Sequence, residues 1–300
     1  MTYIGRFAPS PTGPLHMGSL ITAVASYCQA KNQKGKWLLR IEDIDPPREV
    51  PNASNNIISD LEKLGFEWDG EIIYQSQRQE LYEQALENLH QTNLIYPCGC
   101  SRSEINASSI HTRYGIRYIG TCREGLPVGK KARSIRLKVP DKDFHFTDLI
   151  QGKYNQNLQL DIGDFVVKRA DGQIAYQLAV VIDDATQSVT EIVRGSDLLD
   201  STIRQQYLQQ CLGYAQPSYA HIPVLVNSAG DKLSKQTGAS AINLESSGTA
   251  LIQALCYLNQ APPKSLKRAS VKEIWRWALE HWQIQKIHDQ MNIPVTNGHL

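Results

Sequence analysis

Apolar positions follow two different spacings along the chain, and together they predict alternating strands and helices. Continuous apolar segments predict strands at 3–8, 36–41, 133–139 and 164–169. The run from Gly172 to Asp184, which closes on two aspartates, predicts a central buried strand. Apolar residues three and four apart predict a first helix that begins at Ser19. The same spacing predicts four more helices, at 54–64, 78–90, 249–259 and 271–285. Because a helix separates the first two strands, we expect an α/β fold with a parallel sheet.

Composition limits the class of protein without identifying its function. The 300 residues allow one large α/β domain or two modest ones, and a net charge of +1 excludes a general attraction for polyanions. Six cysteines are typical of reduced thiols in the cytoplasm. We expect a cytoplasmic protein without a membrane span, because no apolar run approaches spanning length and the N-terminus lacks the pattern of a secretory signal.

Positive charge gathers in one stretch of the chain. Between Arg102 and Lys142 there are ten lysines or arginines and three acidic residues. A basic face of this kind can bind nucleic-acid phosphate, although a solvated surface is the commoner explanation of a charge run.

The first candidate site is the loop after the first strand, Pro9-Ser-Pro-Thr-Gly-Pro-Leu-His16-Met-Gly18-Ser19. Its prolines forbid a helix before Ser19, so the chain passes from a strand through a rigid loop to a helix N-terminus. Amide N–H groups and the positive end of the helix dipole suit a phosphate there, and Gly18 lets a nucleotide approach the backbone. The alternative is a proline-rich turn with a surface histidine.

This loop resembles the adenylate-forming site of class I aminoacyl-tRNA synthetases, in their glutamyl/glutaminyl branch. The resemblance implies that His16 and Gly18 act in catalysis and bind ATP together with Ser19, which stands where a final histidine is usual. Lys232-Leu-Ser-Lys235 resembles the second signature of the same class. It implies a cationic clamp on the pyrophosphate, with Lys235 the main catalytic and ATP-binding lysine and Lys232 the second. Gln236 replaces the usual final serine of this signature.

The resemblance also implies a glutamate pocket. Glu42, in the run Arg-Ile-Glu-Asp-Ile-Asp, would bind the amino group, and Arg6 a carboxylate. Arg194 ends a strand and could hold a carboxylate through two parallel hydrogen bonds; otherwise it would form a surface salt bridge. Two arginines and one carboxylate match glutamate better than glutamine. The residues expected around glutamate are Arg6, Ala8, Ser10, Glu42, Tyr176 and Arg194. Ser196 stands where the family pattern has Glu.

Cysteines predict one structural zinc ion per chain. Cys98-Gly-Cys100 and the later Cys122 supply three ligands, and His90, His111 or Tyr118 could be the fourth. Three unrelated buried thiols are the alternative. The segment Tyr118-Ile-Gly-Thr-Cys122 resembles the zinc-bearing insertion of one glutamyl-synthetase-like family, in which tyrosine is a ligand. That resemblance favours Cys98, Cys100, Tyr118 and Cys122.

The resemblance, which covers residues 3–240, implies a Rossmann-like class I catalytic domain. We expect its halves at 1–95 and 166–240, a zinc-binding insertion at 96–165, and a short helical tail at 241–300 in place of a large anticodon-binding region. The short form resembles the glutamyl-Q tRNA(Asp) synthetase family, which places glutamate on the queuosine base of tRNA(Asp) and activates glutamate without tRNA. Expected substrates are ATP with Mg²⁺, L-glutamate and that tRNA, and we expect a monomer. The alternatives are a minimal glutamyl-tRNA synthetase that charges tRNA(Glu) and a catalytically silent tRNA-binding paralogue.

Overall fold

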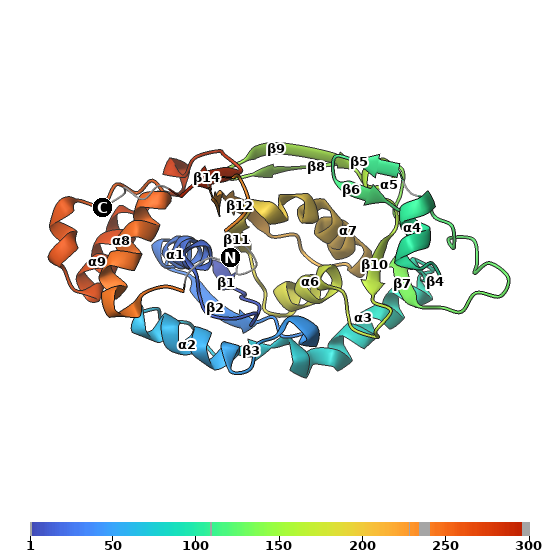
Figure 1. Ribbon diagram of the computed structural model, residues 1–300, viewed down its shortest axis with the longest axis horizontal. Helices are drawn as coiled ribbons and strands as arrows, with labels where there is room; N and C mark the ends of the chain where they lie inside the picture. Colours follow the sequence, from blue (N-terminus) through green and yellow to red (C-terminus); the bar gives the residue numbers. More distant parts are fainter. Residues whose placement is uncertain (1, 109, 228, 234–240, 296–300) are drawn as a thin grey trace.

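The computed structural model describes residues 2–108, 110–227, 229–233 and 241–295. Figure 1 shows an elongated molecule in which the C-terminal helices lie at one end. The other end contains α4 (Arg102–Ser108) with β4, β7 and β10 (Ile95–Cys98, Ser134–Leu137 and Phe165–Lys168), and the first strands lie between the two ends.

Two units of parallel strands build the centre of the molecule. The first unit joins three strands, β1, β2 and β3 (Ile4–Phe7, Lys36–Ile41 and Ile73–Tyr74). The second unit pairs two strands, β11 and β12 (Glu191–Gly195 and Ser218–Ile222). The N–H of Thr190 donates to the carbonyl of Ile4 (N···O 2.9 Å), so the units adjoin along β1 and β11. The predicted α/β fold with parallel strands is confirmed.

Helices connect and cover these strands close to the positions that the apolar spacing predicts. α1 (Met17–Asn32) crosses from β1 to β2 and is buried over most of its length. α2 and α3 lie where helices were predicted (Ala53–Lys63 and Gln79–Gln91). α7 (Thr202–Leu212) connects β11 to β12. α2 and α3 each bury one apolar face, which is why their bounds could be predicted within two residues.

The apolar run from 172 to 184 forms a helix, so the prediction of a central strand is wrong. α6 spans Tyr176–Thr186, and its residues 178–184 are all buried. A continuous apolar run does not distinguish a buried strand from a buried helix, because both lack a polar face. In the helix, Asp183 and Asp184 both reach Arg40 of β2, with N···O distances of 3.8 and 2.8 Å. Successive residues of a strand would point to opposite faces.

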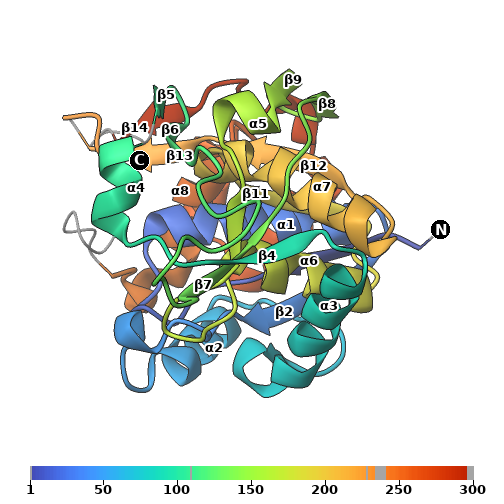
Figure 2. The ribbon, with the colours of Figure 1, turned by 90° about the vertical axis from the view of Figure 1, so that its right-hand side faces the viewer.

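Antiparallel strands form the end of the molecule that carries the cysteines. β4 and β10 (Ile95–Cys98 and Phe165–Lys168) flank β7 (Ser134–Leu137). Two hairpins lie in the same segment, β5–β6 and β8–β9 (Ile110–Thr112 with Gly115–Arg117, and Asp143–Asp148 with Gly152–Asn157). Short helices α4 and α5 complete it (Arg102–Ser108 and Leu158–Asp161). Figures 1 and 2 show α4 near the β5–β6 hairpin, and Figure 1 shows α4 and α8 toward opposite ends of the molecule. The strands predicted at 133–139 and 164–169 are confirmed as β7 and β10.

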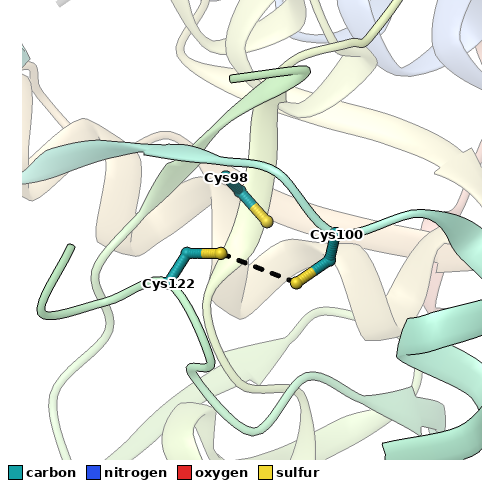
Figure 3. Close-up of side chains that lie close together, drawn as sticks. All are labelled: Cys98, Cys100 and Cys122. Atoms are coloured by element: carbon teal, nitrogen blue, oxygen red, sulfur yellow. Dashed lines mark hydrogen bonds between the residues drawn. The ribbon is translucent and has the colours of Figure 1, made fainter. Parts of the chain in front are cut away.

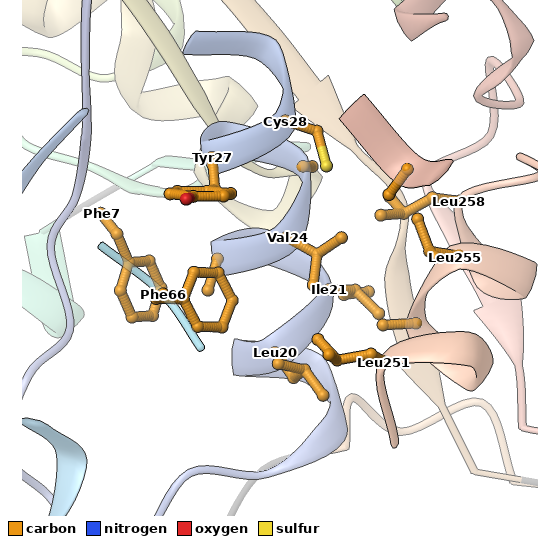
Figure 4. Packing of buried hydrophobic residues seen from close by; sticks show 14 of the residues in the cluster. Phe7, Leu20, Ile21, Val24, Tyr27, Cys28, Phe66, Leu251, Leu255 and Leu258 are labelled. Atoms are coloured by element: carbon orange, nitrogen blue, oxygen red, sulfur yellow. The ribbon is translucent and has the colours of Figure 1, made fainter. Parts of the chain in front are cut away.

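The C-terminal helices share a core with the first helix. α8 and α9 (Ser247–Tyr257 and Val271–His281) occupy the two positions where helices were predicted. Figure 4 shows Leu20, Ile21 and Val24 of α1 facing Leu251 and Leu255 of α8. These side chains are almost completely buried, so α8 helps to fix the helix whose N-terminus was predicted to bind phosphate.

An aromatic cluster and a late strand extend this core. The Trp275 ring of α9 lies 4.8 Å from the Tyr27 ring of α1 and 4.9 Å from the Phe66 ring, measured between centroids. β14 (Asn292–Pro294) pairs in parallel with β13 (Val224–Val226), a pairing that the sequence pattern did not predict. The C-terminal region is therefore part of the central fold and contains a strand as well as helices.

Candidate active site

The carboxyl ends of β1, β2 and β11 open into a cavity of about 450 Å³. Within the described chain, its walls include every residue predicted to bind glutamate or ATP: Arg6, Ala8, Ser10, His16, Gly18, Ser19, Glu42, Tyr176, Arg194 and Lys232. Lys235 and Gln236 lie outside the described residues. The structure brings these distant segments together, at the edge where parallel sheets bind ligands, and the role of each residue stays a prediction.

His16 forms the N-cap of α1. Its Nδ1 accepts a hydrogen bond from the N–H of Ser19 (3.3 Å), and its Nε2 lies 3.2 Å from the Ser19 hydroxyl. Because Nδ1 accepts, the ring proton belongs on Nε2. A Cβ on Gly18 would lie 3.0 Å from Cε1 of His16, so a side chain there would displace the ring. The lack of a side chain at Gly18 thus lets the His16 ring keep its present position, in addition to the close approach that the sequence predicts.

The segment of the second signature lies against the same cavity. The N–H of Leu233 donates to the carbonyl of Leu225 in the middle of β13 (2.7 Å). Lys232 Nζ lies 2.5 Å from Asp197 Oδ2, and both residues line the cavity. Ala241 forms a β-bridge with His16. The two signatures, more than two hundred residues apart in sequence, therefore meet at one site.

A buried network of charges supports the glutamate side of the cavity. Oδ1 of Asp184 accepts hydrogen bonds from Arg40 (2.8 Å) and from Nε of Arg6 (3.1 Å). Arg40 also lies 3.5 Å from Oε1 of Glu42. Burial raises the pKa of Glu42 to about 7, although Arg40 and Arg6 lower it. The Glu42 carboxyl is therefore close to half protonated at neutral pH, and a bound ammonium group would favour its ionised form.

Arg194 is already engaged by protein groups in this structure, so the predicted two-bond contact with a carboxylate would require one of these groups to be released. Its Nε donates to Nε2 of His221 (2.9 Å) and its Nη1 to Oε1 of Gln205 (2.7 Å). Its Nη2 donates to the Leu198 carbonyl (3.3 Å) and the Thr202 hydroxyl (2.9 Å). Four of the five guanidinium N–H groups are thus used within the described residues, and one N–H on Nη1 is left for a ligand.

The three predicted cysteine ligands come together. Figure 3 shows Cys98, Cys100 and Cys122 pointing toward a common centre. Their Sγ atoms lie within 4.8 Å of one another, and all three are free thiols. The Tyr118 hydroxyl lies 3.5 Å from Sγ of Cys98 and 3.7 Å from Sγ of Cys100, and it accepts a hydrogen bond from the N–H of Cys122 (2.9 Å).

This cluster fits a tetrahedral zinc ion. Zinc–sulfur bonds of about 2.3 Å place sulfurs about 3.8 Å apart, and Cys100 and Cys122 are 3.6 Å apart. Arg136 donates to Sγ of Cys98 (3.3 Å) and covers the Tyr118 ring at 3.9 Å, so a cation balances the negative ligands. Burial opposes ionisation of Cys98, but hydrogen bonds from Tyr118 and Arg136 lower its pKa to about 7. Among the described residues no histidine joins the three sulfurs, which leaves Tyr118 as the fourth candidate.

Comparison with known proteins identifies the family. The model for the catalytic domain of class I tRNA synthetases (E and Q) matches residues 4–258. A protein of Dechloromonas aromatica (strain RCB), named glutamyl-Q tRNA(Asp) synthetase, is 52% identical over 290 residues, which are 96% of each chain. The chain belongs to the glutamyl-Q tRNA(Asp) synthetase family. A protein of the same name from Neisseria meningitidis serogroup C (strain 053442) is 53% identical and covers 95% of this chain and 97% of its own.

This family member is similar in structure to larger synthetases. The glutamate-tRNA synthetase of Elizabethkingia anophelis is 26% identical with a TM-score of 0.82, over 99% of this chain and 68% of that one. The Mycobacterium tuberculosis methionyl-tRNA synthetase, at 13% identity and a TM-score of 0.53, shares the fold. None of the helices in the described part of the chain has the length and apolar character that crossing a membrane requires.

Some residues that shape the site of this synthetase-family member are not evident from its sequence. The apolar pattern places Asp184 at the end of a strand, yet this residue holds both Arg6 and Arg40. His221 stands out only as part of the segment before the second signature, and Asp148 does not stand out at all. An acid inside an apolar run is a signal for a buried ion pair and could have revealed Asp184. No spacing rule connects residues 148, 194 and 221.

Proposed function

We propose that this protein activates L-glutamate with ATP, forming glutamyl-adenylate and pyrophosphate, and then transfers the glutamyl group to the queuosine base of tRNA(Asp). The proposal rests on near-full-length identity of about one half to relatives that carry this name. The charges of the cavity support it independently.

The glutamate subsite is proposed at the ends of β1, β2 and β11. Glu42 would accept hydrogen bonds from the α-ammonium group, and Arg6 and Arg194 would each meet a carboxylate. Arg6 donates its Nε–H to Asp184, whereas its terminal nitrogens donate no hydrogen bond to the described residues. Arg6 can therefore offer two parallel N–H groups and Arg194 only one. Ala8, Ser10 and Tyr176 would enclose the side chain, since they line the same cavity.

ATP is proposed to bind between the two signatures. The first turn of α1, with His16, Gly18 and Ser19, would receive the phosphates, because the positive end of the helix dipole favours anions. Lys232 is a neighbour of this turn in the same cavity, and we expect it to bind the pyrophosphate with Lys235. Mg²⁺ would enter with ATP as part of the substrate.

Activation then needs no protein nucleophile. A carboxylate oxygen of glutamate attacks the α-phosphorus of ATP, the P–O bond to the β-phosphate breaks, and pyrophosphate leaves. The arginines would hold the nucleophile, and His16 and the lysines would stabilise the charge that develops on the phosphates. Positioning and electrostatic stabilisation therefore account for the rate that we expect from this site.

A structural zinc ion is proposed at Cys98, Cys100, Cys122 and Tyr118. Four protein ligands would leave no open position for substrate, so the ion would link β4 to the segment around residue 120. This segment lies within the basic stretch 102–142, which we propose contacts RNA phosphate. We expect a monomer that is active in the cytoplasm, where its substrates occur.

The test is ATP–pyrophosphate exchange without tRNA, followed by transfer of labelled glutamate. We expect exchange with glutamate, and none with glutamine or aspartate. Labelled glutamate should then enter tRNA(Asp) that contains queuosine, and should not enter tRNA(Asp) that lacks it or tRNA(Glu). Charging of tRNA(Glu) alone would favour a minimal glutamyl-tRNA synthetase. Absence of exchange even with tRNA present would favour a silent paralogue.

A further inference from the structure

A buried chain of hydrogen bonds connects Arg194 to two residues outside the cavity. Nε of Arg194 donates to Nε2 of His221 (2.9 Å), and Nδ1 of His221 lies 2.6 Å from Oδ2 of Asp148. The exposed fractions of Arg194, His221 and Asp148 are 3%, 0% and 2%. Asp148 ends β8, His221 lies in β12 and Arg194 lies in β11, so three strands converge on this chain.

The geometry determines where the imidazole proton lies. The Nε–H of Arg194 can only donate, so Nε2 of His221 must be the acceptor. The proton therefore sits on Nδ1 and is donated to Asp148. Burial, with the Arg194 cation adding to it, lowers the pKa of His221 to about 4 against the opposing effect of Asp148. A neutral ring in a single tautomer follows.

Asp148 is fixed as firmly as the ring. Its Oδ1 accepts three backbone N–H groups, from Ile150 (3.0 Å), Gln151 (2.9 Å) and His221 itself (3.0 Å). Oδ2 is therefore committed to the ring nitrogen. The carboxylate, the imidazole and the guanidinium form one oriented unit whose far end lines the cavity.

We propose that Asp148 and His221 are positioning residues for glutamate. Together they fix the His221 tautomer that accepts from Arg194, and this aims the one remaining N–H of Arg194 at one substrate carboxylate oxygen. This inference rests on the proposed glutamate activation. It names residues that would control the KM for glutamate without touching substrate or the reacting atoms. Loss of the acceptor would leave the Arg194 Nε–H buried without a partner, and the guanidinium would turn away from its position to find one.

Asp148→Asn tests the tautomer directly. The three N–H groups around Oδ1 hold the asparagine carbonyl oxygen in that place, so its NH₂ must face Nδ1 of His221. Nδ1 then becomes the acceptor, the proton moves to Nε2, and it opposes the Nε–H of Arg194. We expect the KM for glutamate in pyrophosphate exchange to rise about ten- to a hundredfold, with kcat and the KM for ATP within about threefold of their original values. The ¹⁵N shifts of His221 should report the change of tautomer without any assay of activity.

A change at His221 separates positioning from structural support. In His221→Gln the side-chain carbonyl can still accept from Arg194, so the KM for glutamate should stay within about threefold of its original value. His221→Leu removes the acceptor, so it should raise the KM for glutamate as Asp148→Asn does. Asp148→Asn should add little in the His221→Gln background, because no ring tautomer remains there. An unchanged KM in Asp148→Asn, or an equal loss in both backgrounds, would overturn the inference. Lack of glutamate-dependent exchange in the unmodified protein would instead refute the proposed function.

Discussion

Lowering the pH below 7 is expected to weaken glutamate binding, because Glu42 takes up a proton. Burial raises the pKa of Glu42 from 4.5 to about 7, although the nearby Arg40 and Arg6 oppose the change. The proposed partner of this carboxyl is the α-ammonium group of glutamate, and only the ionised form attracts a cation. Over the same range both carboxylates of glutamate remain ionised and its amine protonated.

The size of the effect follows from the position of that pKa. About half of the Glu42 carboxyls are ionised at pH 7 and roughly one in ten at pH 6. The kcat/KM for glutamate should therefore approach a tenfold fall per pH unit below 7 and level off above pH 8. Stability should change in the opposite direction. Because the pKa is raised in the folded protein, the stability that Glu42 contributes is fully present below pH 4.5 and is lost as the pH rises through 7.

Two measurements check this account. Initial rates of pyrophosphate exchange at saturating ATP, with glutamate varied between pH 5.5 and 8.5, give kcat/KM. Thermal unfolding with and without glutamate gives the second measure, because a ligand that binds ionised Glu42 should raise Tm more at pH 8 than at pH 6. The unfavourable ionisation of Glu42 corresponds to roughly 3 kcal/mol above pH 8, which bound glutamate would partly offset.

Glu42→Gln supplies the matched control. Glutamine has nearly the same shape and does not titrate, so we expect a low kcat/KM that keeps only the pH dependence of ATP and of the rest of the protein. A wild-type profile that remains flat between pH 6 and 8, or one that Glu42→Gln reproduces, would refute the role of this carboxyl in binding the amine.

Three further changes test the zinc site and the core. Cys122→Ser should reduce bound zinc below half an equivalent per chain and lower Tm. Cys256→Ser, which lies outside the cluster, should keep one equivalent. Elemental analysis that finds zinc retained in Cys122→Ser would exclude the site. Asp183→Asn removes the buried carboxylate that accepts hydrogen bonds from Gln75 (2.7 Å), Arg78 (2.7 Å) and Tyr82 (2.9 Å), and it should lower the free energy of unfolding, measured in urea, by about 3–5 kcal/mol. Trp275→Ala should lower it by a similar amount, about 3–5 kcal/mol, and a loss below 1 kcal/mol would show that α9 packs only loosely on the core.

Helices with one apolar face could be predicted from the sequence, whereas for α6, which has no polar face, the pattern predicts a strand. α2 and α3 alternate apolar and polar positions at the helical period, so their spacing defines them. α6 is buried along 178–184, and without a polar face its pattern also fits a strand. β14 is three residues long and mostly exposed, and its pairing with β13 depends on tertiary position.

The same limit applies to the candidate site. His16, Glu42 and Lys232 belong to linear motifs that resemble those of class I synthetases, and this resemblance predicts that they share a site; all three line one cavity. Hydrogen bonds between distant strands leave no such trace. The sequence correctly places Arg194 at a strand end beside the pocket. It does not show that Arg194 donates to His221 and Gln205, because these residues are distant from Arg194 in sequence and meet it only in the folded chain.

The pairing of β13 with β14 affects how the protein is made on the ribosome. Val224 and Leu225 line the cavity. Their strand, β13, pairs with β14, which is synthesised about 65 residues later. At about 5–20 residues per second, translation of that interval takes about 3–13 s, during which the edge of β13 is open to other nascent chains. Met291, just before β14, also accepts hydrogen bonds from the Val224 N–H (3.0 Å) and the Ser196 hydroxyl (2.5 Å). Messages that stop before this codon would therefore release chains in which β13 lacks its partner strand, and such chains would be substrates for chaperones and proteases.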